Sequence, residues 1–231
     1  MMTIRKSEDR GKADHGWLKT FHTFSFGTYF DPKHTKFRSL RVLNEDWIKA
    51  GEGFKTHPHE NMEIITYVIE GELEHKDGMG NGSIIRRGEL QRMSAGTGLT
   101  HSEFNPASDE AHLLQIWIFP ERIDLEPGYQ QRDFSATRER DKLTLFASQC
   151  GKHDSLVIHQ DAEIHGGLLD AGKELEYELA LDRHAWIQVI SGELIVNGEE
   201  LSAGDGAAIE EEKRIIIAAA SDSEFMLLDL A

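Results

Sequence analysis

Cysteine is nearly absent from this sequence. Its 231 residues include only Cys150, so no intrachain disulfide can form. No neighbour in sequence suggests an activating partner for this thiol, and we interpret it as structural. Apolar runs of the roughly 20 residues that a membrane helix needs are missing too. The segment Met1–His15 is charged and polar and lacks the apolar core of a signal peptide. We therefore expect a cytoplasmic protein without membrane association.

Basic residues are scarce as well. The 25 lysines and arginines face 41 acidic residues, which gives a formal charge of −16. Such a charge repels nucleic acid phosphates and anionic lipids unless a local basic patch offsets it. The basic residues form only short, isolated clusters, at Arg86-Arg87 and at Arg38 and Arg41. Direct nucleic acid binding is therefore not expected, whereas a protein partner stays compatible with this charge. We expect the chain to be a monomer.

A sustained helical period is the third absence. Short β-rich runs such as Met62–Glu70 and His112–Phe119 alternate instead with glycine-containing turns. Frequent turns between short strands are typical of β-sandwiches and barrels. Eleven Phe and four Trp, within 39% hydrophobic residues, are enough for a folded core. The sequence predicts an all-β protein with few, short helices.

An internal repeat indicates two similar barrels. Residues 68–73 read VIEGEL and residues 189–194 read VISGEL, and each is followed by further strands and a Gly-acid step. The polar segment from Glu121 to about Asp141 contains Pro127-Gly128 and is interpreted as a linker. We predict an N-terminal domain over residues 1–125 and a C-terminal domain over residues 126–231.

Two pairs of side chains have the spacing of metal ligands on strands. His57 and His59 lie two residues apart, and Pro58 between them favours extended backbone. His101 and Glu103 repeat this spacing, and alternate residues of a strand share a face. Two such pairs on neighbouring strands would offer three nitrogens and one oxygen. That ligand set suits one divalent transition metal, whether Fe, Mn, Ni, Co, Cu or Zn, and the donor types alone do not choose among them. Iron is our expectation.

Other residues compete for a place in this site. A single His-x-His pair in a β protein is a structural or surface feature about as often as it is a ligand pair. Glu63 has three interpretations: a fifth ligand, a partner that orients a histidine, or an ordinary polar strand residue. We favour the orienting role. His15 and His22 lie in an aromatic-rich segment and are expected to be packed or hydrogen-bonded. Structural or exposed positions are expected for His75, His112, His159, His165 and His184.

At these residues the sequence resembles the cupin superfamily. The first cupin motif is matched with one extra residue before its last glycine. The second is matched with Ser94 in place of the proline and two extra residues before the histidine. The matching positions are Gly51, His57, His59, Glu63 and Gly71 in the first motif, and Gly88, Gly96, His101 and Asn105 in the second.

More narrowly, the chain resembles the pirin family. The resemblance rests on HGWLKTFHTFSFGTYFDP (residues 15–32), on HPH (57–59) and on MSAGTGLTHSEFNP (93–106), and it extends over essentially the whole chain. It implies a bicupin fold, with two double-stranded β-helix (jelly-roll) barrels in tandem. It also implies His57, His59, His101 and Glu103 as the metal ligands. The carboxylate that spacing left open is thereby assigned to Glu103, whereas the general cupin pattern would select Glu63.

The second barrel lacks these residues. Counted from the repeated VISGEL, the positions matching His57 and His59 are Glu178 and Ala180. No His-x-His follows residue 59. We expect the C-terminal domain to be metal-free and mainly structural.

The resemblance implies two classes of function. The first is a quercetin 2,3-dioxygenase, which opens the flavonol ring with O₂ and releases CO, with Glu103 as the base on the 3-hydroxyl. An apolar wall around the substrate would come from Phe54, Ile65, Met93 and Phe104. The second is a non-catalytic, metal-dependent regulator that acts through protein partners. A cupin enzyme acting on another small metabolite is a third interpretation.

Overall fold

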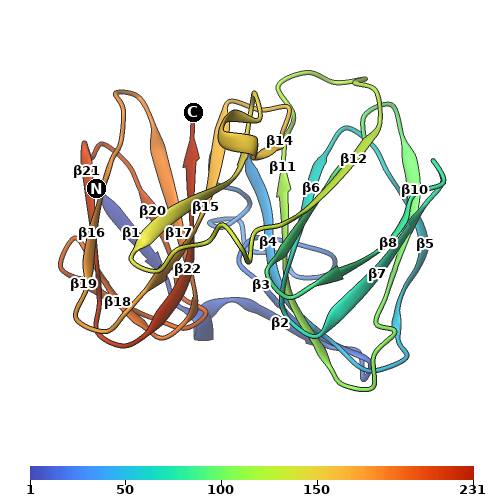
Figure 1. The fold of residues 1–231 in the computed structure, drawn as a ribbon, viewed down its shortest axis with the longest axis horizontal. Coiled ribbons are helices and arrows are strands. Elements are labelled where there is room, and N and C mark those ends of the chain that lie inside the picture. Colours follow the sequence, from blue (N-terminus) through green and yellow to red (C-terminus); the bar gives the residue numbers. More distant parts are fainter. The chain divides into compact units, whose positions relative to one another are not determined.

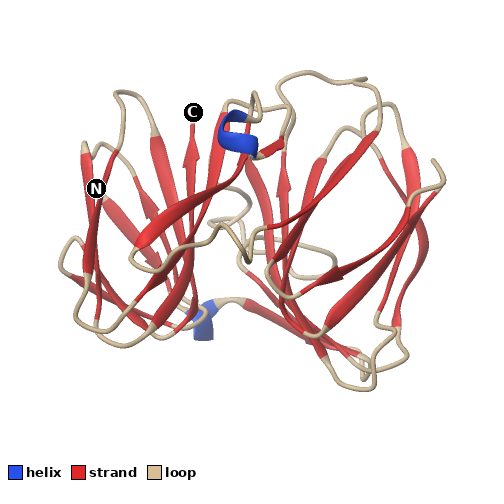
Figure 2. Cartoon of the chain, in the orientation of Figure 1, coloured by secondary structure: helices blue, strands red, loops and turns tan.

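The computed structural model describes residues 1–231, and strands dominate it (Figure 2). The predicted all-β class is confirmed. The helices are two 3-10 turns of three residues each, η1 (Ser7–Asp9) and η2 (Lys152–Asp154). Neither they nor any other segment forms a helix with the length and apolar character needed to cross a bilayer.

The chain divides into two compact units, and the first carries the candidate site. It comprises Gly11–Ser135 and Leu156–Gln160. Its larger sheet has the order β12-β9-β6-β11-β4-β3-β2, and its smaller sheet has the order β5-β10-β7-β8. The strands are β2 (Gly11–Asp14), β3 (Leu18–His22), β4 (Leu40–Ile48), β5 (Gly53–His59), β6 (Glu63–Glu70), β7 (Glu72–Asp77), β8 (Gly82–Arg86), β9 (Glu89–Ser94), β10 (Leu99–Phe104), β11 (Ala111–Ile118), β12 (Gly128–Asp133) and β14 (Leu156–Val157).

The second unit comprises Met1–Arg10, Ala136–Ser155 and Asp161–Ala231. One of its sheets runs β1-β20-β17-β22-β15-β13 and the other runs β16-β21-β18-β19. The strands are β1 (Met2–Arg5), β13 (Lys142–Ser148), β15 (Ala162–Leu169), β16 (Glu174–Glu178), β17 (His184–Ser191), β18 (Glu193–Val196), β19 (Glu199–Ser202), β20 (Gly206–Ile209), β21 (Arg214–Ala219) and β22 (Ser223–Leu230).

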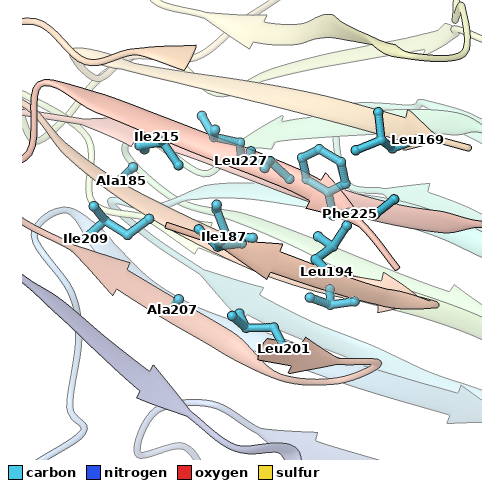
Figure 3. Packing of buried hydrophobic residues seen from close by; sticks show 14 of the residues in the cluster. Leu169, Ala185, Ile187, Leu194, Leu201, Ala207, Ile209, Ile215, Phe225 and Leu227 are labelled. Carbon is cyan, nitrogen blue, oxygen red and sulfur yellow. The ribbon is translucent and has the colours of Figure 1, made fainter. Parts of the chain in front are cut away.

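The interior of the second unit is an apolar core. Alternate residues of its strands, such as Ile187, Phe225 and Leu227, form one buried cluster (Figure 3). Strand β15 makes room for this packing with a glycine. A Cβ on Gly167 would lie 2.3 Å from Cζ of Phe225, so only glycine fits beneath that ring. Apolar side chains therefore fill the interior of the second unit. In the first unit, polar side chains and a cavity lie between the strands.

The unit boundaries differ from the predicted division after residue 125. Residues 1–10 belong to the second unit, because β1 pairs antiparallel with β20, as the blue strand in Figure 1 shows. The predicted linker contains β12, which pairs with β9 from Gly128 opposite Ser94 to Asp133 opposite Glu89. The polarity of this segment is therefore that of an edge strand. Cys150 is exposed in the turn after β13, so its thiol is not packed as a structural residue would be.

Candidate metal centre

The two predicted ligand pairs meet on the smaller sheet of the first unit. β5 and β10 are antiparallel neighbours, and His101 lies directly opposite His57 in their register. The ring centroids of His57, His59 and His101 are separated by 4.5 to 4.9 Å. One ring nitrogen from each lies within 4.8 Å of those of the other two. Three imidazoles are thus close enough to share one ion.

Glu103 belongs to a second, overlapping group. β10 also pairs with β7, where Glu103 lies opposite His75. Ligand atoms of His75, His101 and Glu103 lie within 4.8 Å of one another. The four predicted residues are therefore divided between two groups that share His101. They do not form one set whose ligand atoms all lie within 4.8 Å of one another. Glu103 and the histidines His57 and His59 nevertheless line a common cavity.

His75 was predicted to be structural or exposed, and the structure places it beside the candidate ligands. Its side chain is fully buried, and its Nδ1 lies 3.4 Å from Nδ1 of His101. Its Nε2 lies 3.3 Å from a carboxylate oxygen of Asp77. His75 and Asp77 have the same i, i+2 spacing as the two predicted pairs. That spacing was the one sequence signal that could have found His75.

Burial keeps the rings of His59 and His101 in the form that binds a cation. Burial lowers the pKa of His59 to about 4, with a further contribution from His57. Burial likewise lowers the pKa of His101 to about 2, assisted by its histidine neighbours. His57 directs Nδ1 to the backbone carbonyl oxygen of Lys55 at 2.7 Å, which leaves its Nε2 for a ligand. Neutral imidazole is the metal-binding state of histidine.

An orphaned nitrogen tests whether a metal fits these residues. Nε2 of His101 is buried and has no hydrogen-bond partner. A buried polar atom without a partner is costly in a native structure and calls for a specific explanation. An ion shared with His57 and His59 would satisfy this nitrogen. The residues present therefore fit a divalent transition metal.

The carboxylate of Glu103 is buried and fixed by neighbouring donors. Nε2 of Gln115 lies 2.9 and 2.7 Å from its two oxygens, and the Thr66 hydroxyl donates to Oε1 at 3.4 Å. Burial raises the pKa of Glu103 to about 7, and the nearby charge of Asp46 adds to the shift. Gln115 and Thr66 oppose the shift because they donate to the charged form. Glu103 is therefore a carboxylate with the proton affinity of a general base.

A cavity of about 350 Å³ opens onto this group. Aromatic side chains line part of it, namely Phe26, Phe54 and Trp117, and polar side chains from β3, β4 and β11 line another part. Asn44 on β4 lies opposite both His22 on β3 and Gln115 on β11, so the three share one face of the larger sheet. A flat aromatic molecule with polar substituents matches this lining in chemistry.

Only one of the four predicted wall residues lines the cavity. Phe54 does so, with its ring edge-on to Trp17 at a centroid distance of 5.0 Å. Ile65 and Met93 are completely buried in the core. Phe104 is 40% exposed and is not among the cavity residues, since it alternates with Glu103 on β10 and points to the other face. Core packing and cavity walls use the same residue types, so sequence could not separate them.

Glu63 contacts none of the predicted ligands; the histidine whose ring nitrogen faces its carboxylate, at 3.3 Å, is His159. Its carboxylate accepts hydrogen bonds from the Ser94 hydroxyl at 2.9 Å and from the backbone N–H of His159 at 3.2 Å. Glu63 begins β6, which pairs with β9 and β11 and not with β5 or β10. The glutamate is a buried polar residue, and through His159 it bonds to residues 156–160, which belong to the first unit.

Both groups that could hold a metal lie in the first unit. In the second, Glu178 ends β16 as an exposed residue and Ala180 follows it in a loop. The fold and the site together define a bicupin with one candidate metal centre, formed by the histidines of the first barrel.

Comparison with known proteins takes this class to a family. The pirin family model matches residues 3–118, and the model described as the quercetinase C-terminal cupin domain matches residues 145–230. The chain belongs to the pirin family, as the sequence resemblance predicted.

Relatives extend along the whole chain. A quercetin 2,3-dioxygenase of Escherichia coli (strain K12) is 48% identical over 231 residues, which covers 100% of this chain and 99% of the relative. A pirin-like protein of Caulobacter vibrioides is 40% identical over 232 residues and is covered completely. The crystal structure of the bacterial pirin YhhW from Escherichia coli in complex with nickel(II) superposes with a TM-score of 0.96 at 47% identity. It covers 100% of this chain and 99% of YhhW. In this chain, the clustered histidines are the residues that could hold a metal ion.

Proposed function

We propose that the protein is a metal-dependent quercetin 2,3-dioxygenase, which cleaves the flavonol ring with O₂ and releases CO. The observation that carries the proposal is the cluster of His57, His59 and His101 at a cavity with aromatic walls. The dioxygenase relative at 48% identity supports the choice of reaction. Substrate and O₂ would be the reactants, and the activity needs no nucleic acid or membrane.

The metal would be held by His57, His59, His101 and Glu103. When bound, it would supply positive charge for the flavonol oxygens and a redox-active centre for reaction with O₂. Nickel is the ion that the E. coli pirin binds in its crystal structure. Iron is the ion we propose for this chain, and three imidazoles with a carboxylate suit Fe(II) and Ni(II) alike.

Glu103 would act as the general base. An oxygen of its carboxylate takes the proton from the 3-hydroxyl of the flavonol, which leaves an electron-rich flavonolate for reaction with O₂. Because burial raises the pKa of this carboxyl to about 7, it binds a proton more readily than an exposed glutamate does. A neighbouring cation lowers that pKa, so the working value reflects both influences.

The aromatic residues would position the substrate and exclude water. Trp117 packs edge-on against His59 at a centroid distance of 4.9 Å, and Phe54 lies 6.2 Å from His57. A planar ring between such walls is held by dispersion and by ring–ring contacts. This arrangement would hold the flavonol close to Glu103 and displace water from the cavity.

Turnover of quercetin by the metal-loaded protein tests the proposal. Loss of flavonol absorbance should accompany O₂ uptake and CO release in equal amounts, and chelator-treated protein should show neither. No turnover above buffer with Fe, Mn, Co, Ni or Cu would overturn the dioxygenase assignment. Tight metal binding with no turnover of quercetin would then favour a metal-dependent regulator or an enzyme for another metabolite.

A further inference from the structure

Asp46 is a buried carboxylate that the proposed reaction does not use. It lies on β4, opposite Thr20 on β3 and Leu113 on β11. Its side chain is 3% exposed and lines the cavity that also contains His57, His59 and Glu103. Thr20 forms a hydrogen bond with the carboxyl group. One oxygen of this carboxyl group nevertheless lacks a donor: Oδ1 is buried and has no hydrogen-bond partner.

Protein stability does not explain a carboxylate at this position. A buried acceptor without a partner costs free energy, and a charged acceptor costs more. Its neighbour across the sheet, Leu113, shows that an apolar side chain can occupy the same row. The adjacent Glu45 differs in this respect, because its carboxylate is paired with Nε2 of His112 at 2.9 Å. Of these two acidic residues, only Asp46 is among those that line the cavity.

We propose that Asp46 determines substrate specificity by accepting, at Oδ1, a hydrogen bond from a phenolic hydroxyl of the aromatic substrate. The inference rests on the proposed function and names a contact within it. The hydroxyl concerned is an additional one, distinct from the 3-hydroxyl whose proton Glu103 takes. A phenol is a strong donor, and it supplies the hydrogen bond that Oδ1 lacks within the structure.

The charges around Asp46 restrict the kind of substituent that fits. Asp46 and Glu103 repel each other electrostatically, and Glu45 adds negative charge on the same strand. A carboxylated or sulfated ligand would bring another anion to these groups, at a cost. A neutral hydroxyl donates without adding charge. The cavity should therefore select polyhydroxylated, uncharged aromatics over both unhydroxylated and acidic ones.

A matched pair of flavonols separates this contact from the rest of the site. Quercetin and 3-hydroxyflavone both present the 3-hydroxyl and 4-carbonyl, but only quercetin has further phenolic hydroxyls. Binding of each to the metal-loaded protein can be measured by calorimetry under nitrogen, which prevents turnover. The variants are Asp46→Leu, which removes the acceptor, and Asp46→Asn, which retains an acceptor oxygen. Glu45→Gln is the control, since it removes a neighbouring charge without altering the cavity lining.

The expected result is a loss of affinity for quercetin and not for 3-hydroxyflavone. Asp46→Leu should weaken quercetin binding about tenfold or more and change 3-hydroxyflavone binding little, as expected for loss of one hydrogen bond to a buried acceptor. Asp46→Asn should lie between Asp46→Leu and wild type, and Glu45→Gln should match wild type. Equal changes for the two flavonols, or none, in protein that turns over quercetin would overturn this inference alone. If wild-type protein binds neither flavonol, both this inference and the proposed function fail.

Discussion

Gln115 holds Glu103 by both carboxylate oxygens, with Nε2 of the amide 2.9 Å from Oε1 and 2.7 Å from Oε2. Trp117 fixes the direction of this amide, because its indole N–H donates to Oε1 of Gln115 at 3.0 Å. The chain Trp117–Gln115–Glu103 therefore links a cavity wall to the proposed base. It sets both the position of the carboxylate and its affinity for a proton.

Replacing Gln115 by methionine should shift the pH dependence of catalysis. The hydrogen bond from Gln115 lowers the pKa of Glu103, so its loss raises that pKa. A general base works only when deprotonated, and the acid limb of the kcat profile should therefore move to higher pH. We expect kcat to fall about tenfold or more with metal content unchanged. Gln131→Met is the control, because Gln131 bonds to Glu89 and the Ile84 carbonyl outside the cavity. A lower kcat with an unmoved acid limb would contradict the proposed link.

Loss of a central imidazole should remove the metal. His101→Ala should abolish bound metal and activity while the fold survives, since His101 is common to both groups of candidate ligands. Wild-type protein should hold one equivalent per chain by elemental analysis. His112→Ala serves as the control, because His112 pairs with Glu45 and is in neither group. Full metal occupancy in His101→Ala would exclude the proposed centre.

His75 offers a separate test of what positions His101. Its Nδ1 faces Nδ1 of His101, and its Nε2 faces Asp77, so it can orient the ring without binding the ion itself. Loss of such an orienting partner typically weakens metal binding about 10- to 100-fold. We therefore expect His75→Ala to bind metal, with lower affinity, in a competition assay against a chelator. Complete loss of binding would make His75 a ligand instead, and unchanged affinity would exclude a positioning role.

Asp46 should contribute a loss of stability as the pH of the metal-free protein rises, whereas the lowered pKa values of His59 and His101 act in the opposite direction. Burial raises the pKa of Asp46 from 3.8 to about 7, so in this interval the folded state binds a proton that the unfolded state has released. The contribution of Asp46 should then fall by about 1.4 kcal/mol for each pH unit between these values and level off above them. Asp46→Asn should reduce this slope and be more stable than wild type at pH ~8. Urea unfolding at several pH values measures it, and an unchanged slope would show that Asp46 is not the titrating group.

The sequence predicted those parts of the site that depend on neighbouring residues along the chain. Alternation in a strand put His57 with His59, and His101 with Glu103, on common faces. The structure agrees, with His101 and Glu103 each 2% exposed on either side of the half-buried Ser102. The repeated VIEGEL and VISGEL segments likewise indicated two barrels, because each repeat begins the same succession of strands and turns.

The remaining residues come together only through strand pairing. His75 reaches Glu103 because β7 lies beside β10 in a particular register, and Asp46 shares the cavity because β4 lies between β3 and β11. Register is set by packing across the sheets, and a one-residue slip would turn each side chain to the opposite face. Unit boundaries depend on strand pairing as well. For this reason β1 belongs to the second unit and β12 to the first, whereas the sequence predicted the reverse.

The pairing of β1 with β20 has a consequence for how the second unit is made. Residues 2–5 complete a sheet whose other strands lie between residues 142 and 230, so this sheet is complete only when segments far apart in the sequence have paired. Contacts this distant in sequence slow folding, because the intervening chain has to be ordered first. The C-terminal half expressed alone would have β20 as an unpaired edge. A bulky group attached beside residues 2–5 would therefore disturb the packing of the C-terminal barrel and not that of the barrel nearer to it in sequence.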